Sequence, residues 1–144
     1  MANATVRPPL ILMLGALIAG SVGIANMISW RSLKAKKLYL AQCDVALANP
    51  QFSNPQGLTL DFEAQTANGS REEFERYEWY VARLVYVLDE CLRLCPTSRE
   101  WEAVAHTQLG NHAEYFASDY YVEQDYLDHY SDRMVALIHN VRGE

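Results

Sequence analysis

Lysine is missing from most of this chain of 144 residues. After Lys37 there is no lysine and there are only seven arginines, against eighteen aspartates and glutamates, which gives this part a formal charge of −11. Proteins that bind DNA or RNA neutralise phosphates mainly with lysine and arginine. We therefore expect no nucleic-acid partner.

Cysteine is also scarce, with only Cys43, Cys91 and Cys95 in the chain. An odd number without a paired framework excludes a disulfide-stabilised secreted scaffold and favours reduced thiols. Cys91 and Cys95 lie one helical turn apart, which suits either a metal or redox pair or small side chains packed in a core. A zinc site needs four ligands and no second pair has the usual spacing, so we expect packing.

Charged residues are absent from the stretch Leu10–Trp30. A helix of ~20 mostly apolar residues crosses the ~30 Å hydrocarbon core of a membrane. Four basic residues follow within eight positions, at Arg31, Lys34, Lys36 and Lys37, whereas only Arg7 precedes the stretch. This asymmetry predicts a single-pass protein of the inner (cytoplasmic) membrane, with the N-terminus outside and the C-terminal domain in the cytoplasm.

A cleaved signal peptide is the alternative interpretation of the first thirty residues. Gly23 and Ala25 are small residues that suit a cleavage site before Asn26, and cleavage would yield a secreted helical protein. The length of the apolar run and the basic cluster directly after it favour a retained anchor.

Small residues recur within the apolar stretch at helical spacing. Ala16 is followed by Gly20, and Ala19 by Gly23, each four positions on. Such pairs let two helices approach closely, which indicates a docking face for another copy or for a different membrane protein. Ordinary enrichment of glycine and alanine in membrane helices explains the same pattern.

No series of strands and turns occurs after this stretch, which argues against a sheet. Ser70 and Glu73 form a capping box, and apolar residues from Phe74 to Cys95 then recur at steps of three and four. A second capping box, Thr97 to Glu100, opens another helix. The sequence thus predicts an all-α protein with one N-terminal transmembrane helix followed by a small helical bundle. The predicted divisions are a short tail (1–9), the transmembrane helix (10–30), a basic juxtamembrane helix (31–48), a loop (49–69) and an acidic helical bundle (70–144).

No catalytic motif stands out. Asp125, His129 and Asp132 have the spacing of one helix face and could hold a metal or transfer protons. An acidic solvated face is the commoner explanation, so we expect neither a metal nor another cofactor. His112 lies near an apolar stripe, which is typical of a hydrogen-bonded core histidine.

Tyrosine is abundant, with nine in the chain, and several gather between residues 115 and 130. Tyrosine is enriched at protein interfaces because it combines a large contact area with a polar tip. We expect an aromatic, acidic contact surface there, made by Tyr115, Tyr120, Tyr121 and Tyr126.

The order of parts resembles that of small bacterial single-span proteins of uncharacterised function. The matching features are the N-terminal span, the turn at Ala48-Asn49-Pro50, the helix YEWYVARLVYVLDE (77–90), and REWEAV (99–104) before a tyrosine-rich end. The resemblance implies a membrane-anchored helical domain and no activity.

These features together predict a non-enzymatic interaction module. It would act at the membrane as an accessory subunit, adaptor or regulator of a membrane protein complex, in contact with the lipid bilayer and with a membrane protein partner or further copies of itself. The alternatives are a sensor or effector that self-associates through the span and the apolar seam of 74–95, and a metal-dependent enzyme.

Overall fold

The computed structural model describes the backbone of residues 9–143 and the side chains of residues 21–143. This part of the chain is mainly helical, as the sequence predicts, and one small antiparallel hairpin separates the two longest helices. In chain order the elements are α1 (Pro9–Ala48), α2 (Pro50–Ser53), η1 (Pro55–Gly57), β1 (Leu60–Asp61), β2 (Thr66–Ala67), α3 (Arg71–Leu94), α4 (Arg99–Gly110), α5 (Ala113–Ala117), α6 (Asp119–Glu123), η2 (Tyr126–His129) and α7 (Asp132–Arg142).

No helix in the described part of the chain is long and apolar enough to cross a membrane. From Arg31 onward α1 is basic and packs against α3. The prediction of a transmembrane helix at 10–30 is therefore wrong, and so is the single-pass location in the cytoplasmic membrane. Residues 10–20 of that prediction lie outside the described side chains.

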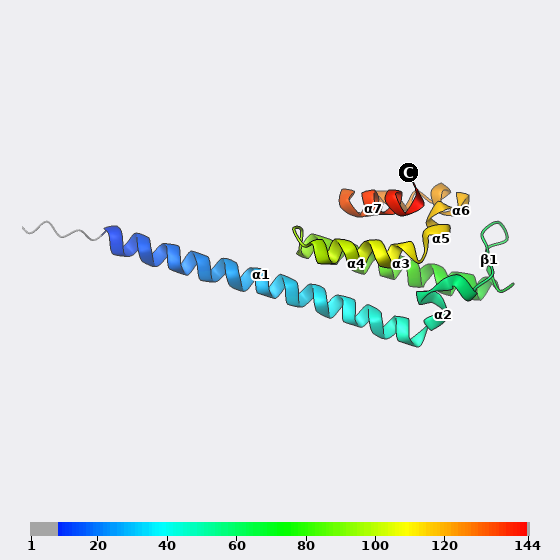
Figure 1. Cartoon of the computed structure of the whole chain (residues 1–144), viewed down its shortest axis with the longest axis horizontal. Coiled ribbons are helices and arrows are strands. Elements are labelled where there is room, and N and C mark those ends of the chain that lie inside the picture. Colours follow the sequence, from blue (N-terminus) through cyan, green and yellow to red (C-terminus); the bar gives the residue numbers. More distant parts are fainter. Residues whose placement is uncertain (1–8, 144) are drawn as a thin grey trace, which may run out of the picture.

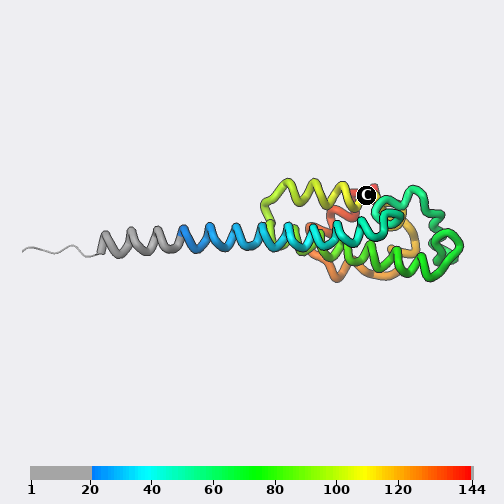
Figure 2. Tube along the Cα trace, turned by 90° about the horizontal axis from the view of Figure 1, so that it is seen from below, coloured from blue at the N-terminus to red at the C-terminus, as the bar shows by residue number. Residues whose placement is uncertain are grey.

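Helix α1 is one continuous helix whose two halves have different surroundings. Its second half lies along α3, whereas its first half projects beyond the bundle (Figures 1 and 2). Where the two helices meet, Ala35 is fully buried and its carbonyl oxygen accepts a hydrogen bond from the Cys91 thiol at 3.4 Å. Arg83 Nε donates to Gln42 Oε1 at 3.0 Å further along the same contact.

Helix α3 is the centre of the bundle, in contact with α1, α4 and α7. It starts at the predicted N-cap, because the Ser70 side chain accepts a hydrogen bond from the Glu73 amide at 3.2 Å, but the Ser70 amide donates to the Ala67 carbonyl oxygen at 2.9 Å rather than to Glu73. Its apolar seam is buried within the same chain, so it is not free to bind a second copy. The buried seam residues are Phe74, Tyr77, Val81, Leu84, Leu88 and Cys91.

The start of α4 differs from the prediction by one residue. The N-cap is Ser98, whose hydroxyl accepts from the Trp101 amide at 3.3 Å, and not Thr97. Both residues have the chemistry of a cap, but Thr97 is exposed and Trp101 is buried. The burial of Trp101 against the core therefore favours Ser98 over Thr97 as the N-cap of α4.

The C-terminal region is divided into short helices that fold back over α3 (Figure 1). Three serines mark the divisions, since Ser98, Ser118 and Ser131 each cap the next helix with the side-chain oxygen. Asp125 has a left-handed backbone with φ of 54°, which ends the helical path before η2. This return places the tyrosines of 115–130 over the α3 residues 78–85.

Candidate functional site

The tyrosines of the C-terminal region form an edge-to-face cluster rather than an exposed surface. The ring centroids of Tyr115 and Tyr121 lie 5.1 Å apart, and those of Tyr121 and Tyr126 lie 5.6 Å apart. Tyr115 and Tyr121 are buried, whereas Tyr120 and Tyr126 are half-buried. Their role in binding a partner stays a prediction, but the structure brings three of these four residues to the wall of one pocket.

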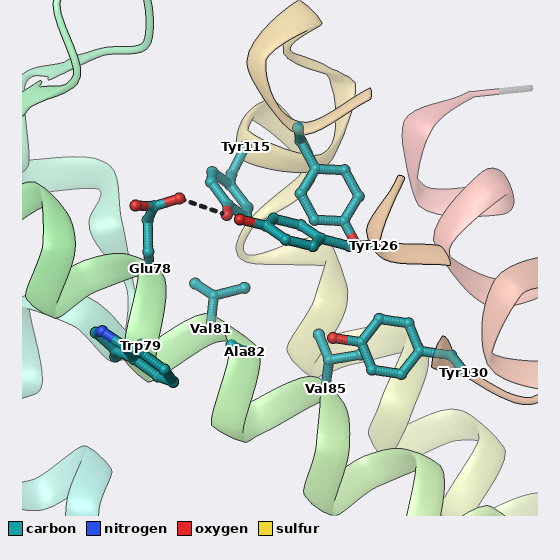
Figure 3. A pocket seen from close by; sticks show the side chains of 9 residues that line it. Glu78, Trp79, Val81, Ala82, Val85, Tyr115, Tyr126 and Tyr130 are labelled. Carbon is teal, nitrogen blue, oxygen red and sulfur yellow. Dashed lines mark hydrogen bonds between the residues drawn. The ribbon is translucent and has the colours of Figure 1, made fainter. Parts of the chain in front are cut away.

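The pocket lies between α3 and the returning C-terminal chain and has a volume of about 250 Å³. Figure 3 shows Glu78 and Trp79 on one side and Tyr126 and Tyr130 on the other, with the hydroxyl of Tyr130 directed inward. The apolar floor comes from α3 and consists of Val81, Ala82 and Val85. The facing wall consists of Tyr115, Tyr121, Tyr126 and Tyr130.

Glu78 is the single charged residue that lines the pocket. Its Oε1 accepts a hydrogen bond from the Tyr115 hydroxyl at 3.3 Å (Figure 3). Within the described residues, the ion pairs join Lys34 to Glu90, Arg93 to Asp89, and Arg133 to Glu102, so no lysine or arginine there neutralises Glu78. The pocket therefore keeps the negative charge of one half-buried carboxylate.

The tyrosines around this carboxylate are held in their neutral form. Burial, and then the charge of Glu78, raise the pKa of Tyr115 above its ordinary value. The same two causes raise the pKa of Tyr126, and burial followed by the charge of Asp89 raises the pKa of Tyr130. The phenols thus remain uncharged donors and present electron-rich ring faces.

Trp79 completes the rim and is 74% exposed. A tryptophan that stays in water on a helix whose other large apolar residues are mostly buried is unusual. Glu78 and Trp79 could not be recognised from helical periodicity, because their positions fall outside the apolar seam of α3. An exposed aromatic residue beside a carboxylate was the available signal.

The acidic-histidine group is not on one helix face. Asp125 precedes η2, His129 ends it, and Asp132 begins α7. Among the residues that the structure describes, no three histidine, cysteine or acidic side chains are placed to hold a metal ion. The three residues do not share a helix face, because the left-handed backbone at Asp125 and the N-cap at Ser131 interrupt the helix.

His112 is a core residue, as its place near the apolar stripe predicts. It is 1% exposed, and its Nδ1 lies 3.0 Å from the Tyr77 hydroxyl oxygen. Burial lowers the pKa of His112 to about 4, so the ring is neutral near pH 7. Cys91 is equally enclosed, and burial raises the pKa of its thiol to about 12, which makes it a poor nucleophile.

The small residues of α1 are only partly described. Gly23 has open space around the position of a Cβ atom, so no neighbour in the chain requires a glycine there. Ala16, Ala19 and Gly20 lie outside the described side chains. Their role as a docking face stays a prediction.

Comparison of the chain with protein families, with curated proteins and with solved structures finds no match. The function must therefore be argued from the surfaces and the pocket of this chain itself.

Proposed function

We propose that this protein is a non-enzymatic interaction module, an accessory subunit or adaptor that inserts the projecting half of α1 between helices of a partner protein. The proposal is supported mainly by the exposure of apolar side chains on this half and just after it, between 46% and 60% of each being accessible. The residues concerned are Val22, Ile24, Met27 and Ile28 in the projecting half, and Trp30 and Leu33 at the start of the second half.

These side chains point in all directions around the helix. At 3.6 residues per turn, Val22 and Leu33 lie on one side while Ile24 and Ile28 lie on the opposite side. A helix that is apolar on every side is typical of one enclosed by other helices, and large exposed apolar patches mark interaction sites. One partner surface would cover only part of this helix, so we expect a groove formed by two or more helices.

The charges beside the apolar section indicate the chemistry of that groove. Arg31, Lys36 and Lys37 are exposed directly after it, whereas Lys34 is 3.7 Å from Glu90 of the same chain. A partner with acidic residues at the mouth of an apolar groove would complement both features.

Site-specific photocrosslinking tests the proposal. A photoreactive amino acid replaces Ile24 in the full chain, in the native cell, and Leu47 is replaced as the control because it is an exposed apolar residue of the same helix beside the bundle. We expect the probe at Ile24 to capture one stoichiometric partner protein and the probe at Leu47 to capture far less of it.

Two results would contradict this function. Capture of a second copy of the chain alone would replace the adaptor with a self-associating effector, and equal capture at both positions would mean that the projecting half has no specific partner. Arg31→Glu with Lys36→Glu provides a further check, because reversing the charges should weaken capture at Ile24.

A further inference from the structure

We propose that the tyrosine-lined pocket binds a methylated ammonium group, carried by a small choline-like molecule or by a methylated lysine side chain. The inference goes beyond the adaptor function, since this pocket lies on the bundle and is separate from the projecting half of α1.

The size of the pocket sets the first limit on the ligand. Pockets for drug-sized molecules measure roughly 300–1,000 Å³, and this one has about 250 Å³. It therefore suits one compact group rather than a large molecule. The α3 floor and the facing tyrosines enclose such a group from two sides (Figure 3).

The charge of the pocket sets the second limit. Its lining consists of one carboxylate, that of Glu78, together with aromatic and aliphatic side chains, and it includes no lysine, arginine or histidine. Aromatic ring faces attract cations, and tryptophan and tyrosine do so more strongly than phenylalanine. An anion would be repelled by Glu78 and by the ring faces, whereas a cation would be attracted by both.

The number of hydrogen-bond acceptors separates the possible cations. A divalent metal needs several oxygen ligands, and the pocket supplies only one carboxylate. A bare ammonium is strongly hydrated and donates three hydrogen bonds, but Glu78 Oε1 already accepts one from Tyr115. A methylated ammonium keeps the charge, needs few acceptors, and places its methyl groups against rings and the Val81–Val85 floor.

Three of the lining aromatic side chains are partly accessible to a ligand. Tyr126 and Tyr130 are half-buried, and Trp79 is largely exposed at the rim. Tyr121 also lines the pocket, and its buried hydroxyl has no hydrogen-bond partner within the described part of the chain. Several aromatic side chains beside one carboxylate are the composition of the aromatic cages that bind methylated ammonium groups.

Calorimetric titration of the purified full chain tests the proposal with three probes. Choline and a short peptide containing trimethyl-lysine carry the charged group, and 3,3-dimethylbutanol is the neutral compound of the same shape as choline. We expect millimolar or tighter binding of at least one charged probe and at least about tenfold weaker binding of the neutral compound. Binding of choline alone would identify a small molecule as the ligand, and tighter binding of the peptide would identify a protein side chain.

Variants of the lining residues provide the matched controls. Glu78→Gln keeps the shape and an acceptor for Tyr115 but removes the charge, and should weaken binding about tenfold, whereas Glu75→Gln on the exposed face of α3 should not. Tyr126→Leu should weaken binding, while Tyr126→Phe, which keeps the ring, should remain within about threefold of the natural protein. Melting temperatures for each variant separate lost binding from lost folding.

The proposal is overturned if no charged probe binds, if the neutral compound binds as tightly as choline, or if Glu78→Gln and Glu75→Gln behave alike in folded protein. None of these results depends on the partner of α1. Failure of the pocket would therefore leave the adaptor function standing, and failure of the crosslinking experiment would leave the pocket standing.

Discussion

At the scale of single residues, the buried pair of Tyr77 and His112 links folding to acidity. Burial lowers the pKa of His112 from 6.5 to about 4, so the folded chain binds fewer protons than the unfolded chain between these values. The stability that depends on neutral His112 is complete above pH 6.5 and is lost as the pH falls towards 4, by up to about 3 kcal/mol.

We predict that His112→Phe flattens this dependence. Phenylalanine fills a similar volume but cannot be protonated, although it leaves the Tyr77 hydroxyl unpaired and costs about 1–3 kcal/mol at every pH. Urea unfolding followed by circular dichroism at pH 7.5, 6, 5 and 4 measures the free energy of unfolding. The exposed His106, replaced by glutamine, is the control and should keep the slope of the natural protein. An unchanged slope in His112→Phe would refute the assignment.

The sequence predicts the role of a residue where that role depends on its neighbours in the chain or on helical periodicity. The cap at Ser70 depends on four consecutive residues, and the burial of His112 follows from the apolar stripe around it. The pocket could not be predicted, because Glu78 and Trp79 gain their role only when residues 115–130 fold back over α3. The sequence of α3 alone does not show that residues 115–130 pack over it.

At the scale of elements, Asp89 holds the beginning of α7 onto α3. It is buried, its Oδ1 accepts a hydrogen bond from the Ser131 hydroxyl, and its Oδ2 accepts one from the Ser131 amide at 3.3 Å. Ser131 is also the N-cap of α7, since its hydroxyl accepts from the Met134 amide at 3.4 Å. One carboxylate thus fixes both the position and the start of the last helix.

We predict that Asp89→Ala lowers the free energy of unfolding by about 2–3 kcal/mol, because it removes two hydrogen bonds from the half-buried Ser131 and detaches the start of α7 from α3. Arg93 pairs with the same carboxylate at 3.0 Å but is half-exposed, so Arg93→Gln should cost less than about 1 kcal/mol. Urea unfolding gives both values, and amide hydrogen exchange should show faster exchange in α7 for Asp89→Ala alone. Equal costs for the two variants would contradict this role of Asp89.

The helices of the C-terminal region show why periodicity alone misplaces elements. In the sequence, apolar residues between Leu127 and Val141 recur at helical spacing and predict one last helix, but the structure divides this segment into η2 and α7. The recurring residues are Leu127, Tyr130, Met134, Leu137, Ile138 and Val141. Ser131 has the short side chain that favours a cap over the interior of a helix. The stripe persists across the division because both pieces pack against the same core.

At the scale of the whole molecule, α1 joins the bundle to the region beyond it. The contact with α3 depends on small residues of α1 such as Ala35, which is 0% exposed and lies against Cys91. The prediction of a membrane span rests on the uncharged length of 10–30 and on the basic residues that follow it. Neither feature of the sequence shows that the same helix continues and packs against α3 of its own chain.

We predict that Ala35→Leu destabilises the bundle by about 1–3 kcal/mol, because the added carbons have no space between α1 and α3. Ala25→Leu is the matched control, since Ala25 is exposed in the projecting half of the same helix and the change should cost less than about 0.5 kcal/mol. Thermal and urea unfolding measure both. A tolerated leucine at position 35 would mean that the two helices are not closely packed.

The continuity of α1 gives the molecule a mechanical property. Between Ile24 and Ala48 the helix contains neither proline nor glycine, so it behaves as a stiff lever about 37 Å long. The second half of α1 is hydrogen-bonded to α3 at Ala35 and at Gln42. The partner of Gln42, Arg83, lies between the pocket-floor residues Ala82 and Val85 in the sequence of α3. Because no proline or glycine provides a hinge in this section, a tilt of the projecting end would also move the part of α1 that packs against α3.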